Sequence, residues 1–123
     1  MKNLVKADKR ELYKEQPFTW YGRYNVPYKL KDMEDRHLFF TVRMIWNHSM
    51  PEEARTHEYR KYQFGSRYTP EYMKSALIHM IPELLNRDQS EWPKQWIDQL
   101  NGMIAWLNRN NMLPKPLQLL ERK

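Results

Sequence analysis

Two stretches of this chain interleave basic and aromatic side chains, a combination that is suited to binding. The first runs from Trp20 to Lys29 and the second from Arg55 to Tyr68. Cations neutralise phosphate groups and aromatic faces stack on unpaired bases, so the pattern fits a nucleic-acid surface. Tyr and Arg also dominate the energetics of protein–protein contacts. The candidate residues for binding a protein partner or nucleic acid are Arg23, Tyr24, Arg55, His57, Tyr59, Arg60, Lys61, Tyr62 and Arg67.

The interleaved pattern has three interpretations, which the sequence leaves open. The surface can bind a protein, it can bind RNA or DNA directly, or its rings can cover a helical core while the basic side chains reach the solvent. The net charge of +6 is uneven, because residues 1–68 hold 14 Lys and Arg against 9 Asp and Glu, and residues 69–123 hold 7 against 6. A basic half favours an anionic partner. We place the protein partner first among the three.

Residues that could perform catalysis are sparse. The chain has no Cys, and its three Gly are too scattered to form a phosphate-binding loop. The four His stand on different expected elements, without the short spacing of a metal site. Asp35 with His37 offers a general base, although a His in this position more often packs at the edge of the core. We expect that the protein is not an enzyme and that it binds no cofactor or metal. The alternative is a small hydrolase-like enzyme whose His and acidic residues meet only in the fold.

The composition is that of a folded domain. Hydrophobic residues make up 41% of the 123 positions and aromatic residues 14%, which is enough apolar material for a core. No apolar run approaches the roughly 18 residues that a membrane span needs. The segment Met1 to Glu15 contains no signal-like hydrophobic stretch. We therefore expect a cytoplasmic protein without membrane contact, a single domain over residues 1–123, with its oligomeric state open.

The elements that must position the binding residues begin near the N-terminus. Residues 1–16 have a thin apolar face, which predicts an arm or a frayed helix. Residues 17–31 combine β-branched and aromatic residues with Gly22 and Asn25, which favour turns. This segment is expected to form a small β-hairpin or two extended stretches.

Residues 32–110 are expected to form a helical core. A central helix at about 33–48, capped by Asp32, is apolar on most faces and should be buried by several neighbours. Two amphipathic helices over 70–108 carry apolar residues at spacings of three and four, and a short connection should fold them into an antiparallel hairpin. The segment 51–68 and the N-terminal arm should form the exposed basic side. The predicted fold class is mainly α.

The ends of the two C-terminal helices carry local signals. Thr69 can cap the first of them, and Pro82 inside it predicts a kink or a split into two short helices. Asn110 and Asn111 can end the second helix in a left-handed turn. The prolines that follow should keep residues 111–123 as a non-helical tail.

One segment carries a more specific pattern. Residues 26–44 read VPYKLKDMEDRHLFFTVRM, and the residues that carry the pattern are Val26, Pro27, Met33, Asp35, His37, Leu38, Val42, Arg43 and Met44. The pattern resembles a segment of small bacteriophage-encoded proteins of mostly unassigned function. Phe40 stands where that pattern has Asn, so any polar role of the Asn is absent here. The resemblance implies a non-enzymatic accessory protein that binds, and inhibits, a host protein or nucleoprotein complex, such as a defence or nucleic-acid-handling assembly, in the host cytoplasm.

Overall fold

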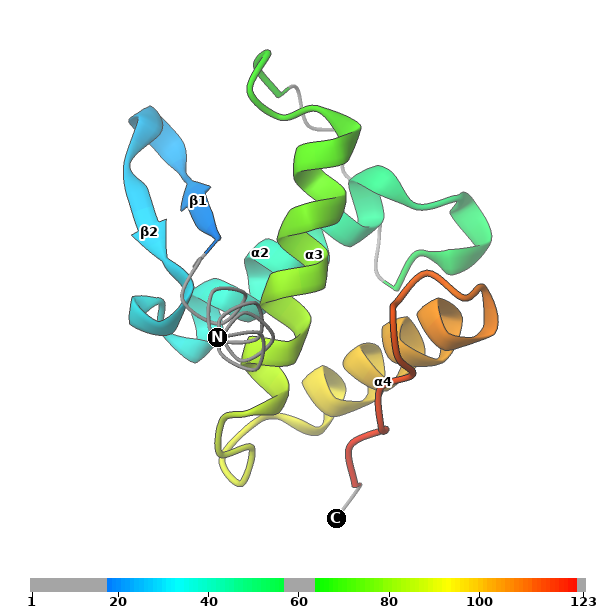
Figure 1. The fold of residues 1–123 in the computed structure, drawn as a ribbon. Helices are drawn as coiled ribbons and strands as arrows, with labels where there is room; N and C mark the ends of the chain where they lie inside the picture. Colours follow the sequence, from blue (N-terminus) through cyan, green and yellow to red (C-terminus); the bar gives the residue numbers. More distant parts are fainter. Residues whose placement is uncertain (1–17, 57–63, 122–123) are drawn as a thin grey trace, which may run out of the picture.

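The computed structural model describes residues 18–56 and 64–121. Over these residues the fold is mainly helical, with a small antiparallel β-hairpin before the helices, which confirms the predicted fold class (Figure 1). The predicted N-terminal arm, residues 1–16, lies outside the described residues. The strands are β1 (Thr19–Tyr21) and β2 (Pro27–Lys29), and the longer helices are α2 (Asp35–Ser49), α3 (Pro70–Leu85) and α4 (Lys94–Arg109).

The hairpin is anchored by one buried aromatic side chain. Trp20 lies opposite Tyr28 in the strand register and is only 3% exposed. Its ring stacks on that of Tyr72 in α3, with the ring centroids 5.7 Å apart. Because successive side chains of a strand point to opposite faces, burying Trp20 leaves its strand neighbours closer to the surface.

The turn of the hairpin is tight and partly left-handed. The Gly22 N–H donates to the Val26 carbonyl at 2.8 Å, and residues Arg23–Asn25 between them form a single 3-10 turn. Tyr24 and Asn25 have φ angles of 61° and 59°. Asn tolerates this region, whereas a Tyr there pays a steric cost of about 1–2 kcal/mol.

Two glycine substitutions should have opposite effects on stability. Gly22→Ala should lower the free energy of unfolding by about 1–2 kcal/mol, because a Cβ would come within 2.8 Å of the Tyr28 ring, which is itself packed edge-on against His37. Gly102→Ala should raise it by about 0.5–1 kcal/mol, because this glycine lies inside α4 and, among the described residues, a Cβ there meets open space. Urea unfolding of the two variants checks this. Equal changes of the same sign would contradict it.

Helix α2 begins later than the sequence predicted. A 3-10 turn (Leu30–Asp32) precedes it, and Glu34 occupies the N-cap position. Asp32 therefore does not cap the helix, and this prediction was wrong. The reason is a distant contact, since the guanidinium of Arg87 donates to backbone carbonyl oxygens at both ends of the turn.

Helix α3 begins as predicted but does not split. The Thr69 hydroxyl accepts a hydrogen bond from the Tyr72 N–H at 3.1 Å, which is the expected N-cap. The helix continues through Pro82 and ends at Leu85. Two apolar residues close to Pro82, Ile81 before it and Leu84 after it, are at most 1% exposed. Their packing in the core offsets the hydrogen bond that Pro82 removes.

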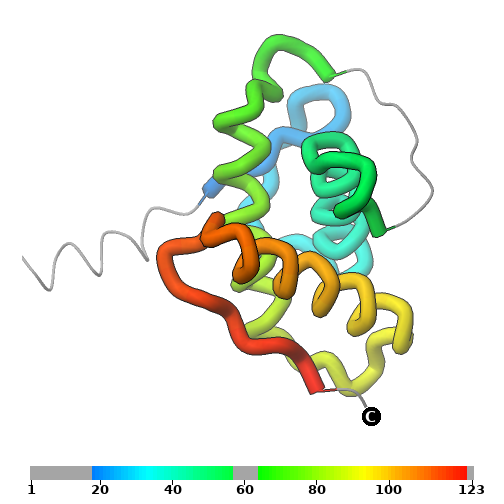
Figure 2. The backbone as a smooth tube through the Cα atoms, turned by 90° about the vertical axis from the view of Figure 1, so that its right-hand side faces the viewer, coloured from blue at the N-terminus to red at the C-terminus, as the bar shows by residue number. Residues whose placement is uncertain are grey.

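The three helices share one hydrophobic core. Helices α2 and α3 are the most closely packed pair and run in opposite directions, and α4 crosses the end of α3 (Figure 2). The two C-terminal helices are joined by residues 86–93, a connection slightly longer than the five residues predicted. The closest partner of α3 is α2, so the predicted antiparallel pairing of the two C-terminal helices with each other is not the main helix pair of the fold. No described helix is long and apolar enough to cross a membrane. The side chains that are at most 1% exposed are Leu38, Phe39, Val42, Ile45, Trp46, Ala76, Met80, Ile81, Leu84, Leu100, Met103 and Ile104.

Candidate partner-binding surface

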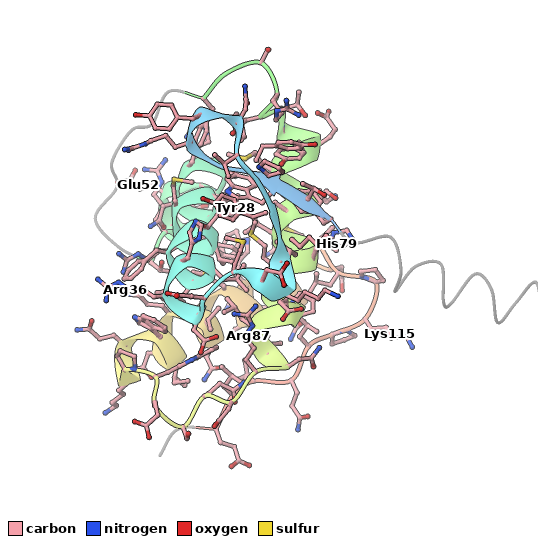
Figure 3. The ribbon with its side chains drawn as sticks, turned by 90° about the vertical axis from the view of Figure 1, so that its left-hand side faces the viewer. Tyr28, Arg36, Glu52, His79, Arg87 and Lys115 are labelled. Atoms are coloured by element: carbon pink, nitrogen blue, oxygen red, sulfur yellow. The ribbon has the colours of Figure 1, made fainter. Side chains whose placement is uncertain are left out.

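Two tyrosines, Tyr72 in α3 and Tyr68 just before this helix, hold the hairpin in place. The Tyr72 hydroxyl accepts a hydrogen bond from the Tyr21 N–H at 3.1 Å and donates one to the Thr19 carbonyl at 2.9 Å. The Tyr68 hydroxyl donates to the Tyr21 carbonyl. These bonds satisfy backbone groups of β1 that the second strand does not reach. Figure 3 looks onto this side of the molecule, with the hairpin lying over α2 and α3.

The contact between the hairpin and α3 is partly shielded from solvent. Burial raises the pKa of the Tyr72 hydroxyl above its ordinary value of 10.0, because desolvation penalises the phenolate more than the hydrogen bond with the Tyr21 backbone favours it. The hydroxyl therefore remains a proton donor to the strand. Tyr72 and Tyr68 position the hairpin, and this is a structural role.

The structure brings three of the predicted binding residues together at one end of the molecule. The guanidinium carbon of Arg67 lies 3.9 Å from the centre of the Tyr21 ring, which is a close cation–π contact. Arg23 and Tyr24 follow in the same hairpin, at its turn. Arg23, Tyr24 and Arg67 are all exposed. We call these three residues, together with Tyr21, the hairpin tip.

Tyr24 is the most prominent side chain of the hairpin tip. It is 89% exposed, whereas the other tyrosines of the described residues are partly buried. Its backbone is left-handed, with φ at 61°. A fully exposed ring at a strained backbone position adds no packing to the fold, so the packing of the described residues does not account for this side chain.

Arg55 lies elsewhere. In the view of Figure 1, residues 50–56 lie to the right of α3 and the hairpin lies to its left. There the Thr56 N–H donates to the side chain of Asn47 at 2.9 Å, and Arg55 is half-buried. Arg55 is therefore not part of the hairpin tip. The other predicted binding residues, His57, Tyr59, Arg60, Lys61 and Tyr62, lie outside the described residues.

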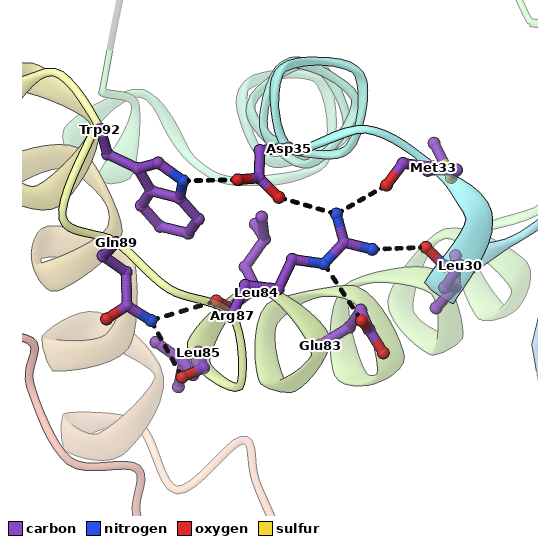
Figure 4. A network of polar contacts seen from close by, with 9 residues as sticks. All are labelled: Leu30, Met33, Asp35, Glu83, Leu84, Leu85, Arg87, Gln89 and Trp92. Atoms are coloured by element: carbon purple, nitrogen blue, oxygen red, sulfur yellow. Dashed lines mark hydrogen bonds and ion pairs between the residues drawn. The ribbon is translucent and has the colours of Figure 1, made fainter.

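The Asp35 and His37 side chains engage separate partners. The two carboxylate oxygens of Asp35 accept hydrogen bonds from Arg87 at 2.9 Å and from the Trp92 indole at 2.8 Å (Figure 4). The His37 ring instead packs edge-on against Tyr28, with centroids 4.9 Å apart. The His37 side chain is exposed, so it contacts the hairpin from the surface rather than the buried core.

The remaining described histidines also pack against aromatic rings. His48 lies edge-on to Phe64 at 4.6 Å, and His79 stacks on Phe18 at 5.4 Å. The Nδ1 atom of His79 is 2.8 Å from the Ser75 carbonyl one turn earlier in α3. Within residues 18–56 and 64–121, no group of three or more His, Asp and Glu side chains is arranged to hold a metal ion.

A second cluster of aromatic rings and arginines, which sequence reasoning missed, lies between α2 and α4. Arg43 and Arg36 place their guanidinium carbons 4.6 Å and 5.2 Å from the centre of the Phe40 ring. The neighbouring Phe39 ring stacks on Trp96 at 4.6 Å. Spacings of three and four residues along α2 put Arg36, Phe40 and Arg43 on one face, which is the signal that a helical-wheel reading offers. The cluster joins α4 to α2.

No protein-family model matches this chain, no curated protein matches it, and no solved structure matches it.

Proposed function

We propose that this chain acts by binding a partner protein rather than by catalysis, with the hairpin tip as its contact surface. The observation that supports this most directly is Tyr24, 89% exposed at a left-handed turn position. Arginine side chains flank it in sequence, at Arg23, and across the joint with α3, at Arg67. Tyr and Arg at the centre of an interface are the residues whose loss costs most binding energy.

The use of the other aromatic rings favours a protein partner over nucleic acid. A surface that binds single strands without sequence preference offers several free aromatic faces in a row. Here Arg67 lies over the ring of Tyr21, and the rings of Tyr68 and Tyr72 pack against Trp20. Among the described tyrosines only Tyr24 is fully exposed, and a single free ring suits a pocket on a protein better than a series of stacked bases.

The resemblance of residues 26–44 to phage proteins extends the proposal to the kind of partner. We propose an accessory protein that binds and inhibits a host protein or nucleoprotein complex. The net charge of +6 supports a complex that handles nucleic acid, since a basic protein is attracted to such assemblies.

The test begins with capture of partners from bacterial lysate by the tagged full-length chain, with and without nuclease. The affinity for a captured protein is then measured for variants of the hairpin tip. Tyr24→Asn removes the ring and suits the left-handed turn, so it should weaken binding by about 30-fold, which corresponds to the roughly 2 kcal/mol of a hot-spot residue. Tyr24→Phe should bind nearly as well as the unmodified chain.

Arg109→Ala is the matched control for Arg23→Ala and Arg67→Ala. Arg109 is exposed and lies over the Trp106 ring, 5.7 Å from its centre, on α4. The control should leave affinity unchanged, while each hairpin-tip Arg variant weakens it. A partner that binds folded Tyr24→Asn as tightly as the unmodified chain would exclude the hairpin tip. Capture only while nucleic acid is intact would favour direct nucleic-acid binding.

A further inference from the structure

Two asparagines of α4 bind the backbone of the chain's own C-terminal segment. The Asn108 amide donates to the Leu117 carbonyl at 2.8 Å and accepts from the Leu117 N–H at 3.0 Å. The Asn101 amide does the same with Leu120, at 2.9 Å and 2.7 Å. Each side-chain amide thus pairs with both backbone groups of one residue, as a neighbouring strand would do. We call Asn101 and Asn108 the asparagine clamp.

The spacing of the clamp matches an extended peptide with a three-residue period. The two asparagines are seven residues apart, nearly two helical turns, so they share a face and lie about 10.5 Å apart along α4. Residues three apart in a polyproline II segment rise about 9.3 Å and again point the same way. In a β-strand, residues three apart face opposite sides. The clamp therefore suits a polyproline II-like backbone running antiparallel to α4 (Figure 2).

The C-terminal segment does not fill all the space beside α4. A cavity of about 470 Å³ lies beside the tail, between the start of α4 and the connection from α3. The helix side contributes Trp92, Lys94 and Ile97, and the tail contributes Gln118 to Glu121. Leu117 and Leu120 pack against the core but stay partly exposed, and Leu119 is 51% exposed. The tail satisfies the clamp without filling the space next to it.

We infer that α4 is a binding site for an extended peptide of a partner protein, and that the C-terminal segment is its tethered stand-in. The peptide must offer a backbone N–H at two positions three residues apart, with large aliphatic side chains there. Bulkier side chains around the second of these positions would enter the cavity. This site lies at the other end of the molecule from the hairpin tip and does not depend on it (Figure 1).

The connection to the tail allows its release without loss of α4. After the helix ends at Arg109, Asn111 adopts a left-handed φ of 52°, and the chain reverses direction. Pro114 and Pro116 then favour an extended, non-helical backbone. A tethered segment competes at an effective concentration on the order of millimolar, so the site is masked until a peptide outcompetes the tail.

The test uses a fluorescent peptide with the sequence of residues 112–121 and the full-length chain. In the double variant Leu117→Pro and Leu120→Pro the tail cannot donate either clamp hydrogen bond. Fluorescence anisotropy should show that this variant binds the peptide at least about tenfold more tightly than the unmodified chain, since the tethered competitor is gone. Adding Asn101→Ala and Asn108→Ala to it should abolish binding.

Asn110→Ala is the matched control, because Asn110 lies at the end of α4 and its amide bonds to the Trp106 carbonyl rather than to the tail. Added to the Leu117→Pro and Leu120→Pro variant, it should leave peptide affinity unchanged. A peptide with Pro in place of both leucines should not bind. The proposal is overturned if the double Pro variant, folded by circular dichroism, binds no better than the unmodified chain, or if the clamp variants bind equally well.

A second measurement covers the case in which the Pro variant does not fold. Excess peptide is added to the isotope-labelled unmodified chain and followed by NMR. The backbone amides of Leu117 and Leu120 should move to unstructured positions, while the side-chain amides of Asn101 and Asn108 keep their bound positions. Unchanged spectra above millimolar peptide would overturn the proposal. A dimer that requires both clamp residues, seen by light scattering, would also overturn it, because the occupant would be the tail of a second copy.

Discussion

Replacing Arg87 by Ala should lower the free energy of unfolding by about 2–3 kcal/mol, because two backbone carbonyl oxygens lose a charged donor and two partly exposed carboxylates lose their partner. Its guanidinium donates to the carbonyl oxygens of Met33 at 2.6 Å and Leu30 at 2.8 Å, and to the carboxylates of Asp35 at 2.9 Å and Glu83 at 3.1 Å (Figure 4). The side chain is only 15% exposed. The substitution leaves two backbone carbonyls without their donor and removes the link between the 3-10 turn Leu30–Asp32, α2 and α3.

Urea unfolding followed by circular dichroism measures this change. Arg87→Lys should lose about half as much, because an ammonium keeps the charge but cannot reach four acceptors in the planar geometry of a guanidinium. Arg109→Ala, an exposed arginine on α4, is the control and should change stability by less than about 0.5 kcal/mol. If Arg87→Ala changed the free energy of unfolding no more than this control, the Arg87 network would contribute no net stability.

The second large effect concerns the core. Trp46→Ala should lower the free energy of unfolding by about 4 kcal/mol, in the range for removing a large buried aromatic side chain. Trp46 is 0% exposed and lies near the C-terminal end of α2. Its indole N–H donates to the Ala54 carbonyl at 2.7 Å, a buried bond that holds the chain after α2 against the helix. The variant leaves both a cavity and a carbonyl without its donor.

Trp46→Phe separates these two contributions. It keeps most of the apolar volume and loses the hydrogen bond, so the expected loss is about 1–2 kcal/mol. Trp106→Ala, on the half-buried side of α4, is the control and should cost clearly less than Trp46→Ala. Thermal and urea unfolding check the order of the three variants. A Trp106→Ala variant as unstable as Trp46→Ala would show that the core is not centred on α2.

Local sequence patterns were enough to predict the elements of this fold. The apolar stripes of α3 and α4 are read from spacings of three and four, and their members are buried in the structure. The Thr69 cap and the left-handed Asn111 follow from side-chain and backbone preferences that act over a few residues. The hairpin within residues 17–31 follows in the same way from β-favouring residues around a turn.

The start of α2 and the pairing of the helices depended on contacts that no local pattern contains. Asp32 has the right chemistry for an N-cap, but Arg87, 57 residues after Leu30, fixes the preceding turn. Pro82 should interrupt a helix, and the buried residues around it keep α3 whole. The apolar stripes of the helices indicate that each helix has a buried face. Which helix covers which face is decided by the shapes of all the side chains together.

The same division holds for the binding surfaces. The sequence alone marked Arg23, Tyr24 and Arg67 as suited to a partner, because their residue types carry that chemistry wherever they lie. It could not separate the exposed Tyr24 from the tyrosines that hold the hairpin, since exposure depends on what packs nearby. Asn101 and Asn108 look like ordinary polar residues of a helix surface. Only the tertiary structure pairs them with the tail, because a backbone hydrogen bond depends on position and not on the type of residue that supplies it.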